Sequence, residues 1–109
     1  LDGVWKPEYQ EMGGQELPKE FLEKQSLAIT NNIYVLTAES TDAGIITITD
    51  DKMDIYGEDG PNAGKHFMAI YKLEENKLTI CYNLAGDAYP ENFETKDKPM
   101  FFLSRFVKE

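Results

Sequence analysis

The chain has 109 residues, of which 41% are hydrophobic and 12% aromatic, and this predicts a single globular domain with one core over residues 1–109. Its 20 acidic and 11 basic residues give a formal net charge of −9 at pH 7, which disfavours nucleic acid and anionic membrane surfaces as partners. No apolar run approaches the roughly 18 residues of a membrane span, and the single cysteine, Cys81, has no partner for an intrachain disulfide.

The first quarter of the chain predicts one strand followed by the only helix in the sequence. Residues 4–12 form the predicted strand, in which Pro7 indicates an edge or a bulge because proline cannot donate to a β-ladder. After a pair of glycines, residues 17–24 have the pattern of a helix of about two turns, with Pro18 at its first position. A helix this short is stable only when it packs against the rest of the chain.

The middle of the chain predicts consecutive β-hairpins. Three pairs of apolar runs are each separated by a short polar turn: 26–30 with 33–38, 44–49 with 52–56, and 66–73 with 77–82. The turn Asn31-Asn32 suits a tight hairpin, because asparagine tolerates the positive φ that such turns require. The third pair is the clearest hairpin, since β-branched and aromatic residues fill both of its runs.

The C-terminal part predicts a long polar connection and a last strand. Residues 85–99 form the connection, and loops of this length are uncommon unless they are functional or packed against the domain. Residues 100–107 form the strand. About eight short strands without alternating helices predict an all-β antiparallel fold. Between a sandwich and an up-and-down barrel, hairpins between neighbouring strands favour the barrel, because closure removes both sheet edges.

Short motifs along nearly the whole chain resemble a bacterial lipocalin-like family that is abundant in planctomycetes. In order, they are Leu1-Asp2-Gly3-Val4-Trp5-Lys6, Leu17-Pro18, Gly60-Pro61, Gly64-Lys65, Ile70-Tyr71-Lys72-Leu73, Leu78-Thr79-Ile80-Cys81-Tyr82, and Pro90 with Phe93. The resemblance implies a small lipocalin-like, calycin-type barrel that is often exported to the periplasm or beyond, and almost no chemistry. The sequence contains no signal peptide but opens without Met, so a targeting segment can lie upstream. The family tends to place Arg before the matching proline, where this chain has Tyr89, so no ionic role is expected at that position.

The segment Gly3-Val4-Trp5 is also similar to the Gly-x-Trp signature at the first strand of lipocalins. In that family the indole closes one end of the barrel beneath an arginine from near the last strand. The resemblance therefore implies that the guanidinium of Arg105 stacks on Trp5, which would stabilise the closure by about 0.5 to 2 kcal/mol. The alternative is that Trp5 is an ordinary core residue and Arg105 is solvated.

Residues with catalytic or metal-binding chemistry form no recognisable pattern. His66 is the only histidine, and Cys81 is better explained as an inert buried thiol than as a nucleophile. The acids near Asp50 and in the loop 57–64 lack the spacing of a calcium loop, and no two carboxylates stand out as a glycosidase pair. We therefore expect no enzymatic activity, no cofactor and no metal site.

Aromatic side chains give the best indication of binding. Six of them are candidates to line an interior site: Tyr34, Tyr56, Phe67, Tyr71, Tyr82 and Phe102. Apolar pockets are typically lined in this way, with hydroxyl groups as polar handles. The same residues also describe a packed core, and the strand register decides which of them point inward. We expect a non-enzymatic protein that binds a small, mainly apolar molecule in the barrel interior or mouth.

A second hypothesis starts from the charge of the chain. A barrel with a solid core could act as an acidic interaction module that recognises a basic protein partner, and this association would be salt-sensitive. The sequence allows a monomer or a dimer, since an exposed edge around Pro7 would offer a pairing surface.

Overall fold

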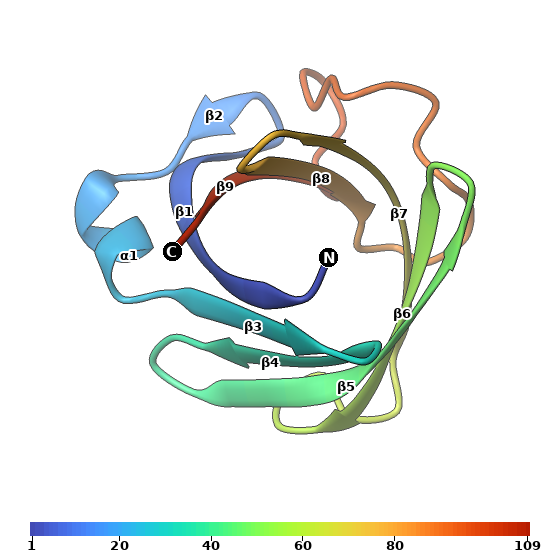
Figure 1. Cartoon of the computed structure of the whole chain (residues 1–109). Coiled ribbons are helices and arrows are strands. Elements are labelled where there is room, and N and C mark those ends of the chain that lie inside the picture. The colour runs from blue at the N-terminus through green and yellow to red at the C-terminus, as the bar shows by residue number, and fades with distance from the viewer.

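Nine β-strands and one short α-helix make up most of the structure, a computed structural model that describes residues 1–109 (Figure 1). In chain order they are β1 (Gly3–Met12), β2 (Gln15–Glu16), α1 (Lys19–Glu23), β3 (Ser26–Thr30), β4 (Ile33–Thr37), β5 (Thr41–Thr49), β6 (Lys52–Asp59), β7 (His66–Glu74), β8 (Lys77–Asn83) and β9 (Phe101–Lys108). Every predicted strand is present. The helix spans five residues and is shorter than predicted, since Pro18 is its extended N-cap residue and Lys24 its C-cap.

Eight of the strands close into one antiparallel barrel (Figure 1). Each barrel strand pairs with the next one along the chain, and β1 pairs with β9, so the first strand meets the last. The two-residue β2 pairs only with the end of β1 and extends that strand outward. The all-β, up-and-down barrel is therefore confirmed, and the arrangement is not a sandwich.

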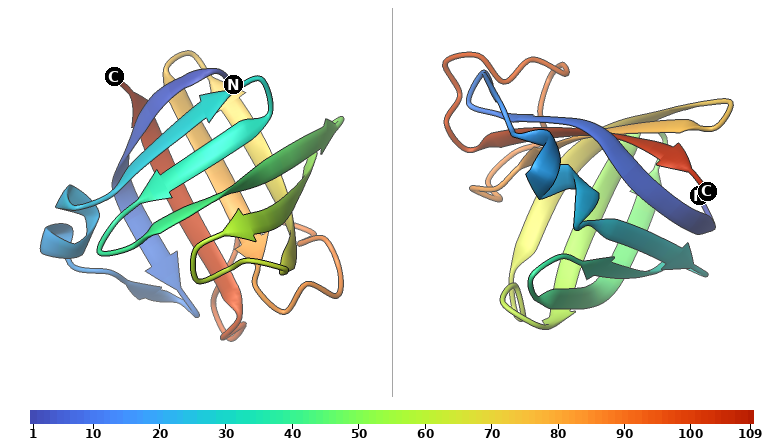
Figure 2. Two further views of the ribbon diagram at one scale, coloured as in Figure 1. Left: turned by 90° about the horizontal axis from the view of Figure 1, so that it is seen from below. Right: turned by 90° about the vertical axis from the view of Figure 1, so that its left-hand side faces the viewer.

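The two ends of the barrel differ in their connections. Three tight turns at residues 31–32, 50–51 and 75–76 lie with both chain termini at one end, which we call the closed end (Figure 2). The helix α1 and the connections 60–65 and 84–100 lie at the other end, which we call the loop end. At the first turn Asn31 and Asn32 have φ of 49° and 68°, as the sequence predicts for a tight hairpin.

Pro7 lies at a β-bulge. The pairing of β1 with β9 shifts register between Pro7 and Tyr9, so that Glu8 is the extra residue. Beyond Trp5, β1 leaves β3. From Lys6 to Gln10 it has a ladder partner only in β9, whereas Glu11 and Met12 also pair with β2. The bulge at Pro7 is confirmed, and the edge expected there is the side of β1 from Lys6 to Gln10 that has no paired strand beside it.

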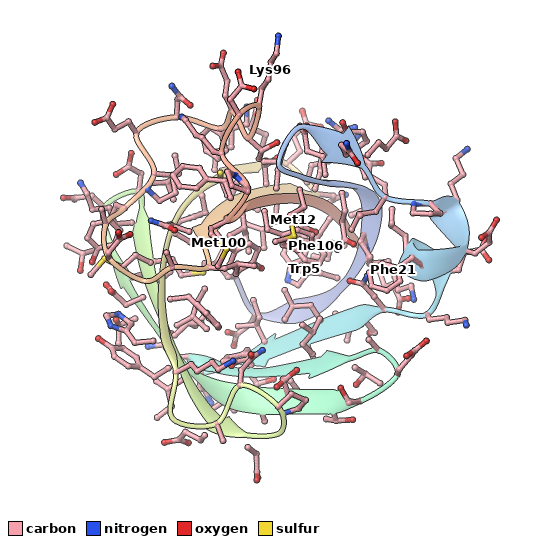
Figure 3. The ribbon with its side chains drawn as sticks, turned by 180° about the vertical axis from the view of Figure 1, so that it is seen from behind. Trp5, Met12, Phe21, Lys96, Met100 and Phe106 are labelled. Atoms are coloured by element: carbon pink, nitrogen blue, oxygen red, sulfur yellow. The ribbon has the colours of Figure 1, made fainter.

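The core fills the closed end of the barrel. Trp5 and Phe106 are only 1% and 2% exposed, and they lie inside the ring of strands in Figure 3. Leu78 is fully buried in the same cluster, which continues along the inward faces of β3 to β8. Burying these side chains supplies most of the free energy that holds the closed end together.

The long connection 84–100 packs on the outside of the barrel. The Tyr89 hydroxyl donates to Asp54 Oδ2 on β6 over 2.5 Å, and the backbone N–H of Gly14 donates to Thr95 Oγ1 over 2.9 Å. Outward-facing side chains of β8 are consequently buried, as Cys81 shows. The unusual length of this connection is therefore explained by packing.

Gly44 on β5 gives a test of the packing. A Cβ at this position would lie 2.0 Å from the Tyr56 carbonyl oxygen and 2.8 Å from Tyr34 Cε2. Gly44→Ala should therefore destabilise the fold by about 3 kcal/mol, because rigid backbone must move to relieve the overlap. The control Gly64→Ala meets no atom within 4 Å, although φ is +83° there; it should cost about 1 kcal/mol. Urea unfolding monitored by circular dichroism measures both, and equal losses of stability would contradict this account.

Candidate functional site

The barrel interior is not filled at the loop end. A cavity of about 240 Å³ extends from the core cluster toward that end. It is larger than the engineered apolar cavity of about 150 Å³ that is known to accommodate benzene. Of the 17 residues on its wall, 13 are hydrophobic, and the polar ones are Gln10, Gln25, Asp42 and Asn62.

Four of the six predicted binding residues line this cavity. Tyr34, Phe67, Tyr82 and Phe102 come from β4, β7, β8 and β9, so the aromatic wall is built from separate strands. The rings of Tyr82 and Phe102 lie 5.7 Å apart between centroids and are tilted by 32°, a typical aromatic pair. The strand register brings them together because each occupies an inward-facing position.

The other two predicted residues lie outside the cavity. Tyr56 faces outward, is 42% exposed, and stacks on the His66 ring with 4.4 Å between centroids. It faces outward because its neighbour Ile55 occupies the inward position on β6. Tyr71 packs against the core cluster, and its hydroxyl donates to the Asp50 carbonyl over 3.0 Å. The prediction that these two residues belong to the interior site is therefore corrected.

The two tyrosines of the cavity offer free hydroxyl groups. Neither the Tyr34 nor the Tyr82 hydroxyl makes a hydrogen bond within the protein, and both hydroxyl oxygens keep some accessible surface. Burial raises the pKa of both phenols above the ordinary value, so both stay protonated at neutral pH. Each can therefore donate a hydrogen bond to a guest in the cavity.

A buried amide pair forms part of the cavity wall near α1. The Gln10 amide donates to Gln25 Oε1 over 2.8 Å, and Gln25 Nε2 donates back to Gln10 Oε1 over 2.9 Å. Gln10 Nε2 also donates to the Ser104 hydroxyl over 3.0 Å. The Lys6 ammonium donates to the Gln25 carbonyl, which ties the start of β3 to β1. The sequence does not indicate this pair, since isolated glutamines form no recognisable spacing pattern.

Asp42 is a second polar residue of the cavity wall that was not predicted from the sequence. It lies on β5, is only 9% exposed, and shares the inward face of the strand with Gly44 and Ile46. Its Oδ1 accepts the backbone N–H of Asn62 over 2.9 Å, which holds the connection 60–65 against the barrel. The predicted strand began at Gly44, and this boundary left Asp42 in a loop. Extending the alternation Ile46, Gly44, Asp42 backward would have placed its side chain inside.

The predicted stacking of Arg105 on Trp5 is wrong. Arg105 points outward between the buried Ser104 and Phe106, and its Nε donates to Glu8 Oε2 over 2.8 Å. The cation nearest the indole is instead the Lys108 ammonium, 5.7 Å from the ring centroid of Trp5.

Trp5 nevertheless lies at the closed end of the barrel. Its indole N–H donates to the Leu1 carbonyl over 2.9 Å. Lys108 rather than Arg105 is the cation near the indole, because Lys108 lies directly opposite Trp5 in the ladder between β1 and β9.

The outer face of β6 and β7 carries a small polar cluster. His66 Nε2 lies 2.7 Å from Asp54 Oδ1, and the hydrogen bond to Asp54 raises the pKa of the Tyr89 phenol. The polar cluster on β6 and β7 therefore anchors the connection 84–100, through the hydrogen bond from Tyr89 to Asp54.

Burial raises the pKa of the Cys81 thiol to about 11, so it is not a thiolate at neutral pH. No three His, Cys, Asp or Glu side chains gather in a geometry that could hold a metal ion.

Comparison with protein-family models, with curated proteins and with solved structures gave no match. The class of this protein therefore follows from its own structure: it is a small lipocalin-like barrel with a mainly apolar interior cavity. Its one helix is too short to cross a membrane.

The amide pair gives a test of how the cavity wall is held. Gln10→Leu should destabilise the fold by about 2 kcal/mol, because it leaves the buried Gln25 amide without its partner. The double variant Gln10→Leu/Gln25→Leu should lose less stability than the sum of the two single variants, since neither amide remains. Ser104→Ala, which removes only one hydrogen bond, is the control and should cost about 1 kcal/mol. Chemical denaturation measures all four variants, and strictly additive losses would contradict the reciprocal pairing.

Proposed function

We propose that this protein is a non-enzymatic carrier that binds a small, mainly apolar molecule inside its barrel. The observation that carries the proposal is the cavity of about 240 Å³, with its aromatic wall and its two free tyrosine hydroxyls. A mostly apolar pocket with few polar groups is the usual form of a small-molecule site. The size of the cavity suits a single ring or a chain of medium length.

The balance of free energies sets the expected affinity. Burying about 200 Å² of apolar ligand surface contributes about 5 kcal/mol, and the lost motion of the ligand cancels part of it. Dissociation constants in the micromolar to millimolar range are therefore expected for guests without specific polar contacts.

The cavity favours this proposal over the acidic interaction module. That alternative needs a solid core, whereas the barrel is hollow at its loop end. The proposal of a non-enzymatic role is supported by the wall itself, on which Asp42 is the only acidic side chain and no lysine, arginine, histidine or cysteine is present. Membership of the lipocalin-like family, and export, remain proposals supported by the sequence resemblance.

Binding can be tested with a panel of neutral guests, 2-phenylethanol, n-octanol and naphthalene. We expect saturable binding by calorimetry and a rise in melting temperature for at least one of them, because ligand binding to the native state stabilises it. Ile46→Phe places a larger side chain on the cavity wall and should weaken this binding at least about tenfold.

The matched control is Ile45→Phe on the same strand, because Ile45 faces outward and is exposed. It should leave the affinity unchanged. Absence of saturable binding across the panel, or equal effects of the two substitutions, would contradict the proposed function.

A further inference from the structure

The cavity wall carries one formal charge. Among its lining residues Asp42 is the only acidic side chain, and no lysine, arginine or histidine reaches the cavity. A pocket that holds fatty acids or other anions needs a basic group or a set of donors at the head of the ligand. Here the fixed charge has the opposite sign.

Asp42 is buried without a cation. Asp42 is only 9% exposed, and none of the four ion pairs of the protein includes it. Oδ1 accepts the Asn62 N–H, while Oδ2 accepts no hydrogen bond from the protein and remains accessible. Aspartate is rarely buried in this way unless it is paired, because removing a carboxylate from water is costly.

The surroundings of Asp42 also suit a cation. The Tyr34 hydroxyl is close enough for the charge of Asp42 to add to the effect of burial and raise the phenol pKa. Aromatic rings line the wall, and rings of this kind attract ammonium groups through their π-electrons. The net charge of −9 over the whole chain favours the approach of cations at long range.

We infer that the guest of this cavity is a small amine, with its ammonium group bound by the Asp42 carboxylate and its hydrocarbon part packed among the aromatic rings. The inference rests on the proposed function and adds the chemical class of the ligand. Asp42 then has two roles, since Oδ1 holds the connection 60–65 and Oδ2 receives the ligand.

The competing explanation is that Asp42 only holds the connection 60–65 through Asn62. Asp42→Asn separates the two roles, because the asparagine oxygen still accepts the Asn62 N–H while the negative charge is lost. Asp59→Asn is the matched control. Asp59 lies on β6 beside Ala43, next to Asp42, and it is exposed and does not line the cavity. The substitution Asp59→Asn therefore removes one carboxylate from the same region as Asp42→Asn does, but from outside the cavity.

The test compares three guests of similar shape, 2-phenylethylamine, 2-phenylethanol and 3-phenylpropanoate, by calorimetry at low ionic strength. We expect the amine to bind about tenfold more tightly than the alcohol, because a charge-assisted hydrogen bond adds to the same hydrophobic contact. The carboxylate should bind more weakly than the alcohol. In Asp42→Asn the amine should lose its advantage, whereas Asp59→Asn should retain it.

The outcomes separate the two proposals. If the alcohol binds and the amine binds no more tightly, or if Asp42→Asn retains the preference for the amine, the inference is wrong and the carrier function stands. If none of these three guests binds to a folded protein, and n-octanol and naphthalene do not bind either, the carrier function itself is wrong. Melting temperatures of the variants show whether each remains folded.

Discussion

The backbone pairing of β1 with β9 holds the whole structure together. It runs from Trp5 opposite Lys108 to Met12 opposite Phe102, and it converts a meander of hairpins into a closed ring. Without it both edge strands would expose unpaired N–H and C=O groups, and the sheet would enclose no interior. The pairing with β9 begins at Trp5, where the pairing with β3 ends, and continues past the bulge at Glu8, which bends the strand locally.

Closure alone does not decide whether the barrel is hollow. At the closed end Trp5, Leu78 and Phe106 fill the interior, whereas at the loop end polar residues form part of the wall. The pair Gln10 and Gln25 satisfies its own hydrogen bonds and therefore does not collapse into the space. One end thus supplies stability and the other a space that a guest can enter.

Much of the fold follows from the sequence, because alternating apolar residues and turn residues such as Asn31-Asn32 determine hairpins locally. The site follows less directly, since it depends on which face of each strand points inward. Tyr56 was predicted to line the interior, but on β6 it is the neighbouring Ile55 that points inward. The cation near Trp5 is Lys108 rather than Arg105 because the β1 to β9 register, formed between the chain ends, decides it. Asp42 was missed because its strand begins three residues earlier than the apolar pattern.

The most direct measurement of the central claim, a closed barrel with an accessible interior, is a crystal structure determined under xenon pressure. Xenon enters apolar cavities that are large enough to hold it. We expect a xenon site between Tyr34, Ile46 and Phe102, inside a barrel closed by β1 and β9. An interior occupied by the protein's own rings with no xenon, or a sheet open between the first and last strands, would contradict it.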